Sequence, residues 1–527
     1  MKSLSPAAAA LAATLLLAPA AGAQSPAPFD PPAFLQQLQD TDSRNAAANR
    51  IPSLPAAALA PLLEADASPA TPKAVRDILD ARLPTLAKTL RADRAKHDQA
   101  LDDAWTQQQL LTPYKNGPSA GQLLPKIEPA LRIIASDKID YPTLKAAVDA
   151  QAAANIKPDD PAIHLAFVID GLNSRQMPLD HAARQLDPAI AALDASHYSN
   201  GVKFILHRWL LSCMLSNNWP SASTIKANIG DETDRVLTLL PAFVAEHPGQ
   251  ERLQRNIIRL ARNLMTQLGA EKARLRLSPV LDESLAGNAA RDAALALLFE
   301  EWGWDARGAG FANTVTDQGW QLFDDRCKKA REFAQTAWRE DPLNHAAPDT
   351  MIRISMDLQL GDDTMESWFQ RAMIADPDDA DACDNKAFYL SPQWHGDPTD
   401  AVLFGRQCIN TGTPRNRISL TIVSVYQNLN GFLDPPNSLY LDPEVWHDLQ
   451  AAYNVVLSDK SRLLDDRALY LADRSALLNA ALLCHQYQPF LDLARQFGND
   501  IDLTALGGKD RYAFYQKNAA KKLAAPH

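Results

Sequence analysis

The segments AWREDPLNHAA (Ala337–Ala347) and AMIADPDDADAC (Ala372–Cys383) follow the same pattern within this 527-residue chain. In each segment, residues that favour a helix lead into an Asp-Pro pair, and the prolines Pro342 and Pro377 are 35 residues apart. Because proline lacks the N–H that a helix interior needs, it marks the point where one helix stops and the next can start. The repeated pattern therefore predicts two consecutive helical hairpins.

The positions of small residues indicate the kind of repeat. Ala337 and Ala372 each stand five residues before the proline, where the second helix of a tetratricopeptide repeat (about 34 residues long) carries a small residue. Arg353 departs from this motif, which prefers a glycine at that place. A single hairpin cannot cover its own apolar face, so hairpins of this kind stack on one another. We therefore predict an all-α fold, an α-α superhelix of the tetratricopeptide-like helical-repeat (solenoid) type.

The remainder of the chain also favours helices. The whole chain contains only 21 glycines, 46% of its residues are hydrophobic, and few stretches alternate between polar and apolar residues as strands do. Apolar residues recur every three or four positions in Thr71–Leu111, where Pro84 is expected to kink the helix or split it in two. Ile418–Leu429 is predicted to be a buried helix, whereas the glycines of Trp302–Phe311 predict an ordered loop.

These patterns divide the chain into five parts. The predicted parts are a signal peptide (1–23), an N-terminal helical region (24–115), a helical-repeat region (116–300), a tetratricopeptide-like region (301–433) and a C-terminal helical cap (434–527). The second boundary falls in a stretch rich in turn-forming residues, TPYKNGPSAG (Thr112–Gly121).

The first 23 residues have the pattern of a secretory signal. Lys2 is their only charged residue, Ala7–Leu17 is an apolar run, and small residues precede a predicted cleavage site between Ala23 and Gln24. The apolar run is shorter than the roughly 20 residues that a membrane-spanning helix needs, and no later segment is apolar enough. We therefore expect a periplasmic or secreted protein without a membrane span.

Charge and motif content narrow the function further. The formal net charge is −11 at pH 7, with acidic and basic residues interspersed, so the basic surface of a nucleic-acid-binding protein is missing. No phosphate-binding loop or metal-ligand spacing occurs, and we expect no cofactor and no metal. The five cysteines are far apart, and four of them lie among apolar neighbours, which predicts buried core residues. A disulfide between Cys383 and Cys408 stays open.

A resemblance to a known family rests on two stretches. They are WGWDARGAGFANTVTDQGWQLF (Trp302–Phe323) and WFQRAMIADPDDADACDNKAFYLSPQWHGDPTDAVLFGRQC (Trp368–Cys408). Over about residues 300–430, the chain resembles uncharacterised bacterial proteins whose tetratricopeptide-like region forms a domain of unknown function. The resemblance implies a helical-repeat fold, and it implies no reaction, cofactor or ligand.

Two segments combine aromatic and charged residues in a way that suits ligand binding. In the first segment, Trp302–Phe311, the candidate binding residues are Trp302, Trp304, Asp305 and Arg307. The second segment, Tyr389–Pro398, is an enlarged loop between the two helices of one predicted hairpin, and its candidates are Trp394, His395 and Asp397. Aromatic faces and a guanidinium can hold a polar ligand together, and functional residues concentrate on such loops. The alternative is structural: the tryptophans fill gaps between hairpins, Asp305 pairs locally with Arg307, and Asp397 caps the next helix.

Three functions remain open. The first is a non-enzymatic interaction scaffold that binds a protein or peptide along its concave face, as solenoids do. The second is a hydrolase acting on an envelope or polysaccharide substrate through a carboxylate such as Asp305 or Asp397. The third is an assembly factor that works by self-association. No catalytic residue is assigned, and the oligomeric state is left open.

Overall fold

The structure is a computed structural model that describes residues 29–115, 120–136, 140–155, 160–174, 176–216, 228–246, 248–394, 396–433, 435–462 and 467–524. Throughout these residues the secondary structure is helical and no strand occurs, so the predicted all-α helical-repeat fold is confirmed. The predicted signal peptide and its cleavage site (Ala23 and Gln24) lie outside the described residues. The contacts divide the chain into two compact units, Met1–Leu86 and Ala87–His527.

The first unit is a small cluster of helices. Its elements are α2 (Pro31–Gln39), α3 (Arg44–Arg50), the 3₁₀ turns η1 (Ile51–Ser53) and η2 (Ala56–Ala58), α4 (Leu59–Asp66) and the beginning of α5 (Lys73–Thr106). Helix α5 continues through Pro84, so of the two outcomes expected at this proline, a kink or a split, the split does not occur. Leu79, Leu83 and Leu86 are buried around the proline, and this burial offsets the hydrogen bond that Pro84 cannot make.

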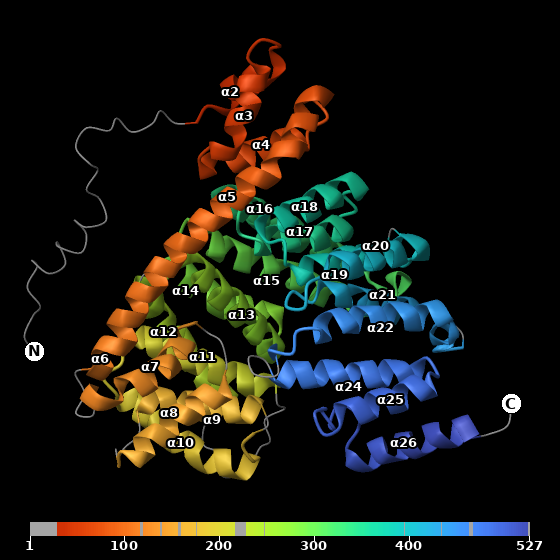
Figure 1. Ribbon diagram of the computed structural model, residues 1–527. Coiled ribbons are helices and arrows are strands. Elements are labelled where there is room, and N and C mark those ends of the chain that lie inside the picture. Colours follow the sequence, from red (N-terminus) through yellow and green to blue (C-terminus); the bar gives the residue numbers. More distant parts are fainter. Residues whose placement is uncertain are drawn as a thin grey trace, which may run out of the picture. The chain divides into compact units, whose positions relative to one another are not determined.

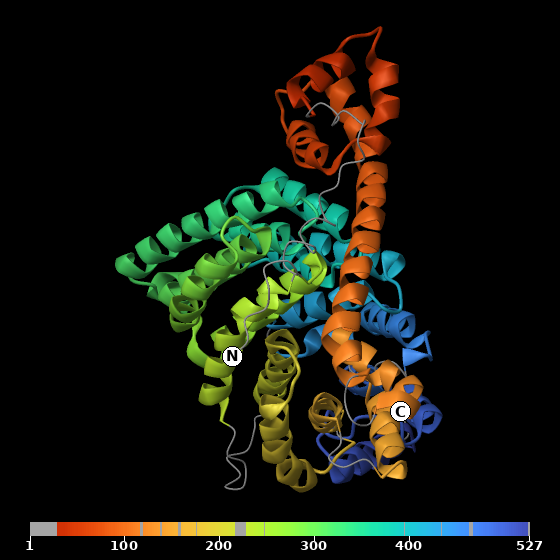
Figure 2. The same ribbon diagram turned by 90° about the vertical axis from the view of Figure 1, so that its left-hand side faces the viewer.

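The second unit is a stack in which most helices pack on the next one along the chain (Figures 1 and 2). After the rest of α5 come the π-helical turn η3 (Gln107–Leu111) and α6 (Thr112–Lys115). Two layers then alternate along the chain. The odd-numbered layer consists of α7 (Ala120–Ser136), α9 (Pro161–Asn173), α11 (Asn200–Ser216), α13 (Gln250–Leu268), α15 (Ala289–Arg307), α17 (Ala346–Asp357), α19 (Ala380–Tyr389) and α21 (Thr421–Asn430). The even-numbered layer consists of α8 (Tyr141–Ala153), α10 (Leu179–Ala195), α12 (Ile229–Ala245), α14 (Ala270–Ser284), α16 (Asp317–Glu340), α18 (Asp362–Ala375) and α20 (Pro398–Thr411).

Short turns and four C-terminal helices complete the unit. The 3₁₀ turns are η4 (Ala312–Thr314), η5 (Ile418–Leu420) and η6 (Ser438–Leu441), and the helices are α22 (Pro443–Leu457), α24 (Arg467–Leu483), α25 (Tyr487–Phe497) and α26 (Lys509–Ala524). The predicted buried helix at Ile418–Leu429 is confirmed as η5 and α21. In the described part of the chain, no helix is long and apolar enough to cross a bilayer.

The two layers are spaced differently. Each odd-numbered helix from α7 to α21 packs its backbone closely against the next odd-numbered helix, whereas α14, α16, α18 and α20 contact one another less. Large aromatic side chains fill the wider spaces of the even layer: Trp338 of α16 meets Trp368 of α18 at a ring-centroid distance of 5.4 Å, and Phe369 of α18 meets Phe404 of α20 at 5.6 Å. The stack therefore curves, with the odd-numbered helices on its inner face.

Asp-Pro pairs start several helices. Asp160, Asp397 and Asp442 precede the first residue of α9, α20 and α22, and each carboxylate accepts a hydrogen bond from a backbone N–H of the first turn. The proline that follows already has the backbone angle of a helix and has no N–H to satisfy. At Pro342 and Pro377, by contrast, the proline follows the end of α16 or α18, as the repeat pattern predicts.

The predicted loop at Trp302–Phe311 is wrong over most of its length, because α15 continues to Arg307 and ends at Gly308, where φ is +73°. Gly303 lies inside the helix because α16 approaches closely there: a Cβ atom on Gly303 would lie 2.9 Å from the Sγ of Cys327. The glycine therefore serves packing rather than a turn.

All five cysteines lie in the described part of the chain, where they are buried and form no disulfide. Cys383 of α19 and Cys408 of α20 are neighbours, and a hydrogen bond between them together with burial raises the pKa of the Cys383 thiol. The disulfide that the sequence left open is therefore not formed in this structure, although the two thiols are adjacent.

We predict that Gly303→Ala destabilises the protein by about 1–3 kcal/mol, the usual cost of overpacking a core, even though alanine favours helices more than glycine does by about 1 kcal/mol. Chemical denaturation would measure this change. In a Cys327→Ala background the clash with Sγ is removed, so the same substitution should then be neutral or stabilising. An equal loss of stability in both backgrounds would contradict this explanation.

Candidate functional site

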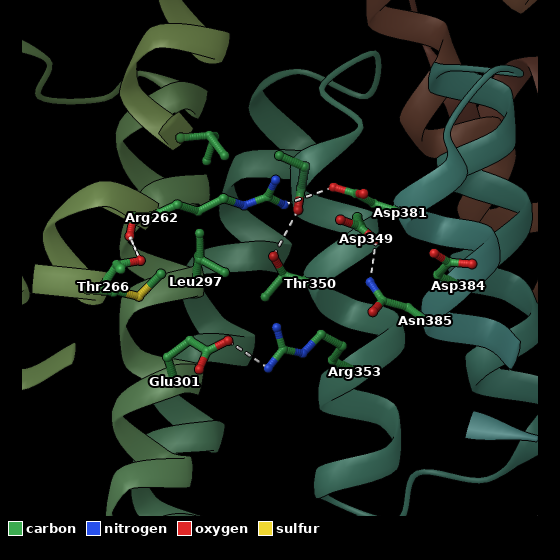
Figure 3. Close-up of a pocket in the computed structure, with 13 residues that line it drawn as sticks. Arg262, Thr266, Leu297, Glu301, Asp349, Thr350, Arg353, Asp381, Asp384 and Asn385 are labelled. Atoms are coloured by element: carbon green, nitrogen blue, oxygen red, sulfur yellow. Dashed lines mark hydrogen bonds and ion pairs between the residues drawn. The ribbon is translucent and has the colours of Figure 1, made fainter. Parts of the chain in front are cut away.

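The inner face carries a polar groove with a cavity volume of about 620 Å³. Four consecutive inner helices, α13, α15, α17 and α19, supply its walls (Figure 3). The polar residues that line it are Arg262 and Thr266 from α13, Glu301 from α15, Asp349, Thr350 and Arg353 from α17, and Asp381, Asp384 and Asn385 from α19. A site that draws on four repeats at once is typical of the concave face of a solenoid.

Ion pairs cross this groove at two levels. Arg262 reaches from α13 to Asp381 on α19, with a distance of 3.0 Å between Nη2 and Oδ2 (Figure 3). Deeper in the groove, Nη2 of Arg353 lies 2.8 Å from a carboxylate oxygen of both Glu300 and Glu301. Glu300 is fully buried, and burial raises the pKa of its carboxyl well above the ordinary range despite the opposing charge of Arg353. The guanidinium of Arg353 is thus already engaged by α15.

The groove has an excess of acidic groups. Asp349 is 7% exposed and accepts a hydrogen bond from Nδ2 of Asn385 at 2.6 Å. Burial, reinforced by the neighbouring charges of Asp379 and Asp381, raises the pKa of Asp349 to about 7. Asp384 lines the same groove. With the two arginines paired, the groove favours a ligand that carries positive charge.

An aromatic pocket of about 680 Å³ lies further along the same inner helices. It begins one helical turn beyond the polar groove: Trp304 follows Glu301 on α15, Asp357 follows Arg353 on α17, and Phe388 follows Asp384 and Asn385 on α19. The aromatic residues that line it are Trp304, Phe311, Trp320, Phe323, Phe388, Trp394 and Phe432. The polar groove and the aromatic pocket therefore occupy successive sections of one face.

The aromatic rings of this pocket support one another edge to face. The ring centroids of Trp304 and Trp394 are 5.7 Å apart, those of Phe388 and Trp394 are 5.9 Å apart, and those of Trp304 and Phe323 are 5.4 Å apart. Such pairs are favourable beyond their apolar burial. They fix the loop between α19 and α20 against the end of α15.

Three of the sequence-predicted residues, Trp304, Arg307 and Trp394, come together in the aromatic pocket although they belong to segments about 90 residues apart. Trp302 faces elsewhere and lies between two guanidinium groups, 3.7 Å from Arg326 and 4.3 Å from Arg274. His395 lies outside the described residues. The sequence-based selection thus found part of the pocket and included one tryptophan that packs apart from it.

The two carboxylates predicted from the sequence, Asp305 and Asp397, accept backbone hydrogen bonds at the N-termini of α14 and α20. Oδ2 of Asp305 accepts a hydrogen bond from the backbone N–H of Ala270, the first residue of α14, at 3.3 Å. Oδ1 of Asp397 accepts one from the N–H of Thr399 at 2.7 Å, and hydrogen bonds from the side chain and the backbone of Thr399 lower the pKa of Asp397. Neither carboxylate is among the residues that line the polar groove or the aromatic pocket. The structural alternative given for Asp397 is therefore correct, whereas Asp305 contacts α14 rather than pairing with Arg307.

The sequence interpretation missed the polar groove entirely. Its residues are spread over about 120 positions and come from four helices, and none belongs to a recognisable binding or catalytic motif. A usable signal lies in α17, where Asp349, Arg353 and Asp357 recur every four residues along an otherwise apolar helix. Charged residues at that spacing share one helix face. Within the described residues, no group of three or more His, Cys, Asp or Glu side chains is placed to hold a metal ion.

Comparison of the chain with protein-family models, with curated proteins and with solved structures found no match.

The raised pKa of Asp349 gives a testable pH dependence. Its folded-state value of about 7 exceeds the unfolded value of about 3.9, so its contribution to stability is fully present below pH ~3.9 and is lost as pH rises through ~7. We expect the wild-type free energy of unfolding to decline between pH 5 and pH 8, and Asp349→Asn to decline less. Urea denaturation at several pH values would measure both slopes. Asp363→Asn, an exposed residue of α18, should keep the wild-type slope, and an unchanged slope for Asp349→Asn would contradict the assignment.

Proposed function

We propose that this protein is an exported interaction scaffold that binds a protein or peptide along the inner face of its helical stack. Export rests on the signal-like composition of residues 1–23. Binding rests on the two recesses of the inner face, which offer a polar section and an aromatic section in sequence. An extended polypeptide suits such a surface, because its backbone and polar side chains can contact the polar section while an apolar side chain contacts the aromatic section.

The observation that carries the proposal is the meeting of Trp304, Arg307 and Trp394 in one pocket beside the polar groove. Large aromatic residues and arginine dominate the energetics of protein interfaces because they bury much area at little entropic cost. Here they stand at the end of a groove lined by four repeats. A ligand longer than a single small molecule can therefore contact both sections.

The alternative, a hydrolase that uses Asp305 or Asp397, has less support. Both carboxylates accept backbone hydrogen bonds at the start of a helix, and neither lines the polar groove or the aromatic pocket. Binding therefore accounts better for the arrangement of the side chains than hydrolysis through these two residues does.

Selection from a random peptide library displayed with free C-termini would test the proposal, using the purified chain from Gln24 onward. We expect peptides to be enriched and their synthetic forms to bind at micromolar affinity. Trp394→Ala removes an aromatic wall of the pocket, and Thr266→Arg places a bulky cation at an exposed position in the groove. Each should weaken binding at least tenfold, a loss of about 1.4 kcal/mol, as measured by titration calorimetry.

A matched control is Phe514→Ala, which removes an exposed aromatic ring from α26. This variant should bind the selected peptides as the wild type does. Circular dichroism should show unchanged helical content for all three variants. Failure to enrich any peptide, or undiminished binding by both Trp394→Ala and Thr266→Arg, would contradict the proposal.

A further inference from the structure

Arg307 is held rigidly at the edge of the aromatic pocket. Its guanidinium carbon lies 5.1 Å from the ring centroid of Trp304, 5.4 Å from that of Trp320 and 5.9 Å from that of Trp394. Its Nη1 donates hydrogen bonds to the carbonyl oxygens of Gly308 and Gly310, both at 3.0 Å. These contacts fix the position of the cation without neutralising its charge.

Among the residues that the structure describes, no carboxylate forms an ion pair with Arg307. Of the described residues that line the aromatic pocket, Arg307 is the only basic one and Asp357 the only acidic one. Asp357 is occupied in a buried cluster with Arg353, Glu300 and Cys327, and burial raises its pKa to about 7. Within the described residues, the pocket therefore presents a positioned guanidinium that is not paired with a carboxylate, since the one acidic residue of its lining, Asp357, is engaged in that cluster.

The remaining surface of the pocket defines the rest of the ligand. Seven aromatic residues enclose about 680 Å³, which is room for a large apolar side chain next to the guanidinium. The polar groove lies one helical turn away, and its excess of acidic groups, including Asp349 and Asp384, complements a basic residue. A chain end with an apolar last residue and a basic residue upstream fits all three features.

We propose that the aromatic pocket binds the C-terminal residue of a partner polypeptide, with an apolar side chain among the tryptophans and its free α-carboxylate paired with Arg307. The inference rests on the proposed function and specifies which end of the peptide the inner face recognises. A guanidinium can bind a carboxylate through two parallel N–H···O hydrogen bonds. Its preorganisation by three indole rings and two carbonyl groups reduces the entropy lost on binding.

Synthetic peptides separate the carboxylate from the rest of the ligand. The probes are acetyl-Ala-Lys-Ala-Ala-Phe with a free carboxylate, the same peptide as its C-terminal amide, a version with Glu in place of Lys, and phenylacetate alone. Binding is followed by the fluorescence of the pocket tryptophans and by calorimetry. We expect the free acid to bind at least tenfold more tightly than the amide, and the Lys peptide more tightly than the Glu peptide.

Substitution of Arg307 assigns the effect to its guanidinium. Arg307→Met keeps an apolar stem against the indole rings and should bind the acid and the amide equally, whereas Arg307→Lys should keep part of the preference. Arg495→Met, which changes an exposed arginine of α25, should keep the full preference. Thermal unfolding would confirm that all three variants are folded.

Three results would overturn the inference: equal binding of acid and amide by the wild type, an undiminished preference in Arg307→Met, or phenylacetate binding as tightly as the peptide. The first two leave the proposed function intact if library-selected peptides still bind in a Trp394-dependent way. If no peptide binds at all, the proposed function fails together with the inference.

Discussion

The unequal spacing of the two helix layers is the constraint on which the rest of the molecule depends. The inner helices pack backbone against backbone, whereas α16, α18 and α20 are held further apart by pairs of large rings such as Trp338 with Trp368. The guanidinium of Arg371 stacks on both of these indoles, 4.2 and 4.1 Å from their centroids, and adds to the side chains that fill the space between α16 and α18. A stack that is thicker on one side must bend toward the other. This bend brings α13 near α19 although two inner helices lie between them.

The bend also determines what the inner face can contain. Side chains from neighbouring inner helices converge there, so charged groups lie close together and are partly withdrawn from water. The consequences are visible in the raised pKa values of Asp349 and Asp357, both about 7, for which burial is the largest cause. Packing such groups lowers stability, because a buried charge loses its hydration. Sites that retain them usually serve recognition rather than stability.

The sequence predicted the architecture well because helical hairpins are encoded locally. Asp-Pro pairs, capping carboxylates and small residues at fixed spacing all act within a few residues of one another, as at Asp397 and Pro398. It failed where a residue's role is set by a distant neighbour. Gly303 resembles a helix breaker until the Sγ of Cys327 is found 2.9 Å from the place of its missing Cβ. Pro84 likewise stays inside a helix because surrounding leucines are buried.

For the candidate site, the sequence could identify aromatic clusters but not the residues that pack against them. Trp304, Arg307 and Trp394 were selected because tryptophans beside charged residues are unusual in an alanine- and leucine-rich chain. Trp302 has the same local setting and packs between Arg274 and Arg326 instead. Trp302 and Trp304 lie on different faces of α15, so only the three-dimensional arrangement shows that Trp304 lines the pocket and Trp302 does not. The polar groove required four helices to be placed and could not be foreseen.

The ion pair between Arg262 and Asp381 has a consequence for access to the inner face. It joins helices that are not neighbours, and its side chains are 52% and 60% exposed. An ion pair in such a wet position contributes at most about 1 kcal/mol, and dissolved salt weakens it further. If the inner face binds a peptide as proposed, that peptide displaces this ion pair at little energetic cost when it contacts Arg262 and Asp381 itself. The strength of this contact across the groove therefore depends on ionic strength.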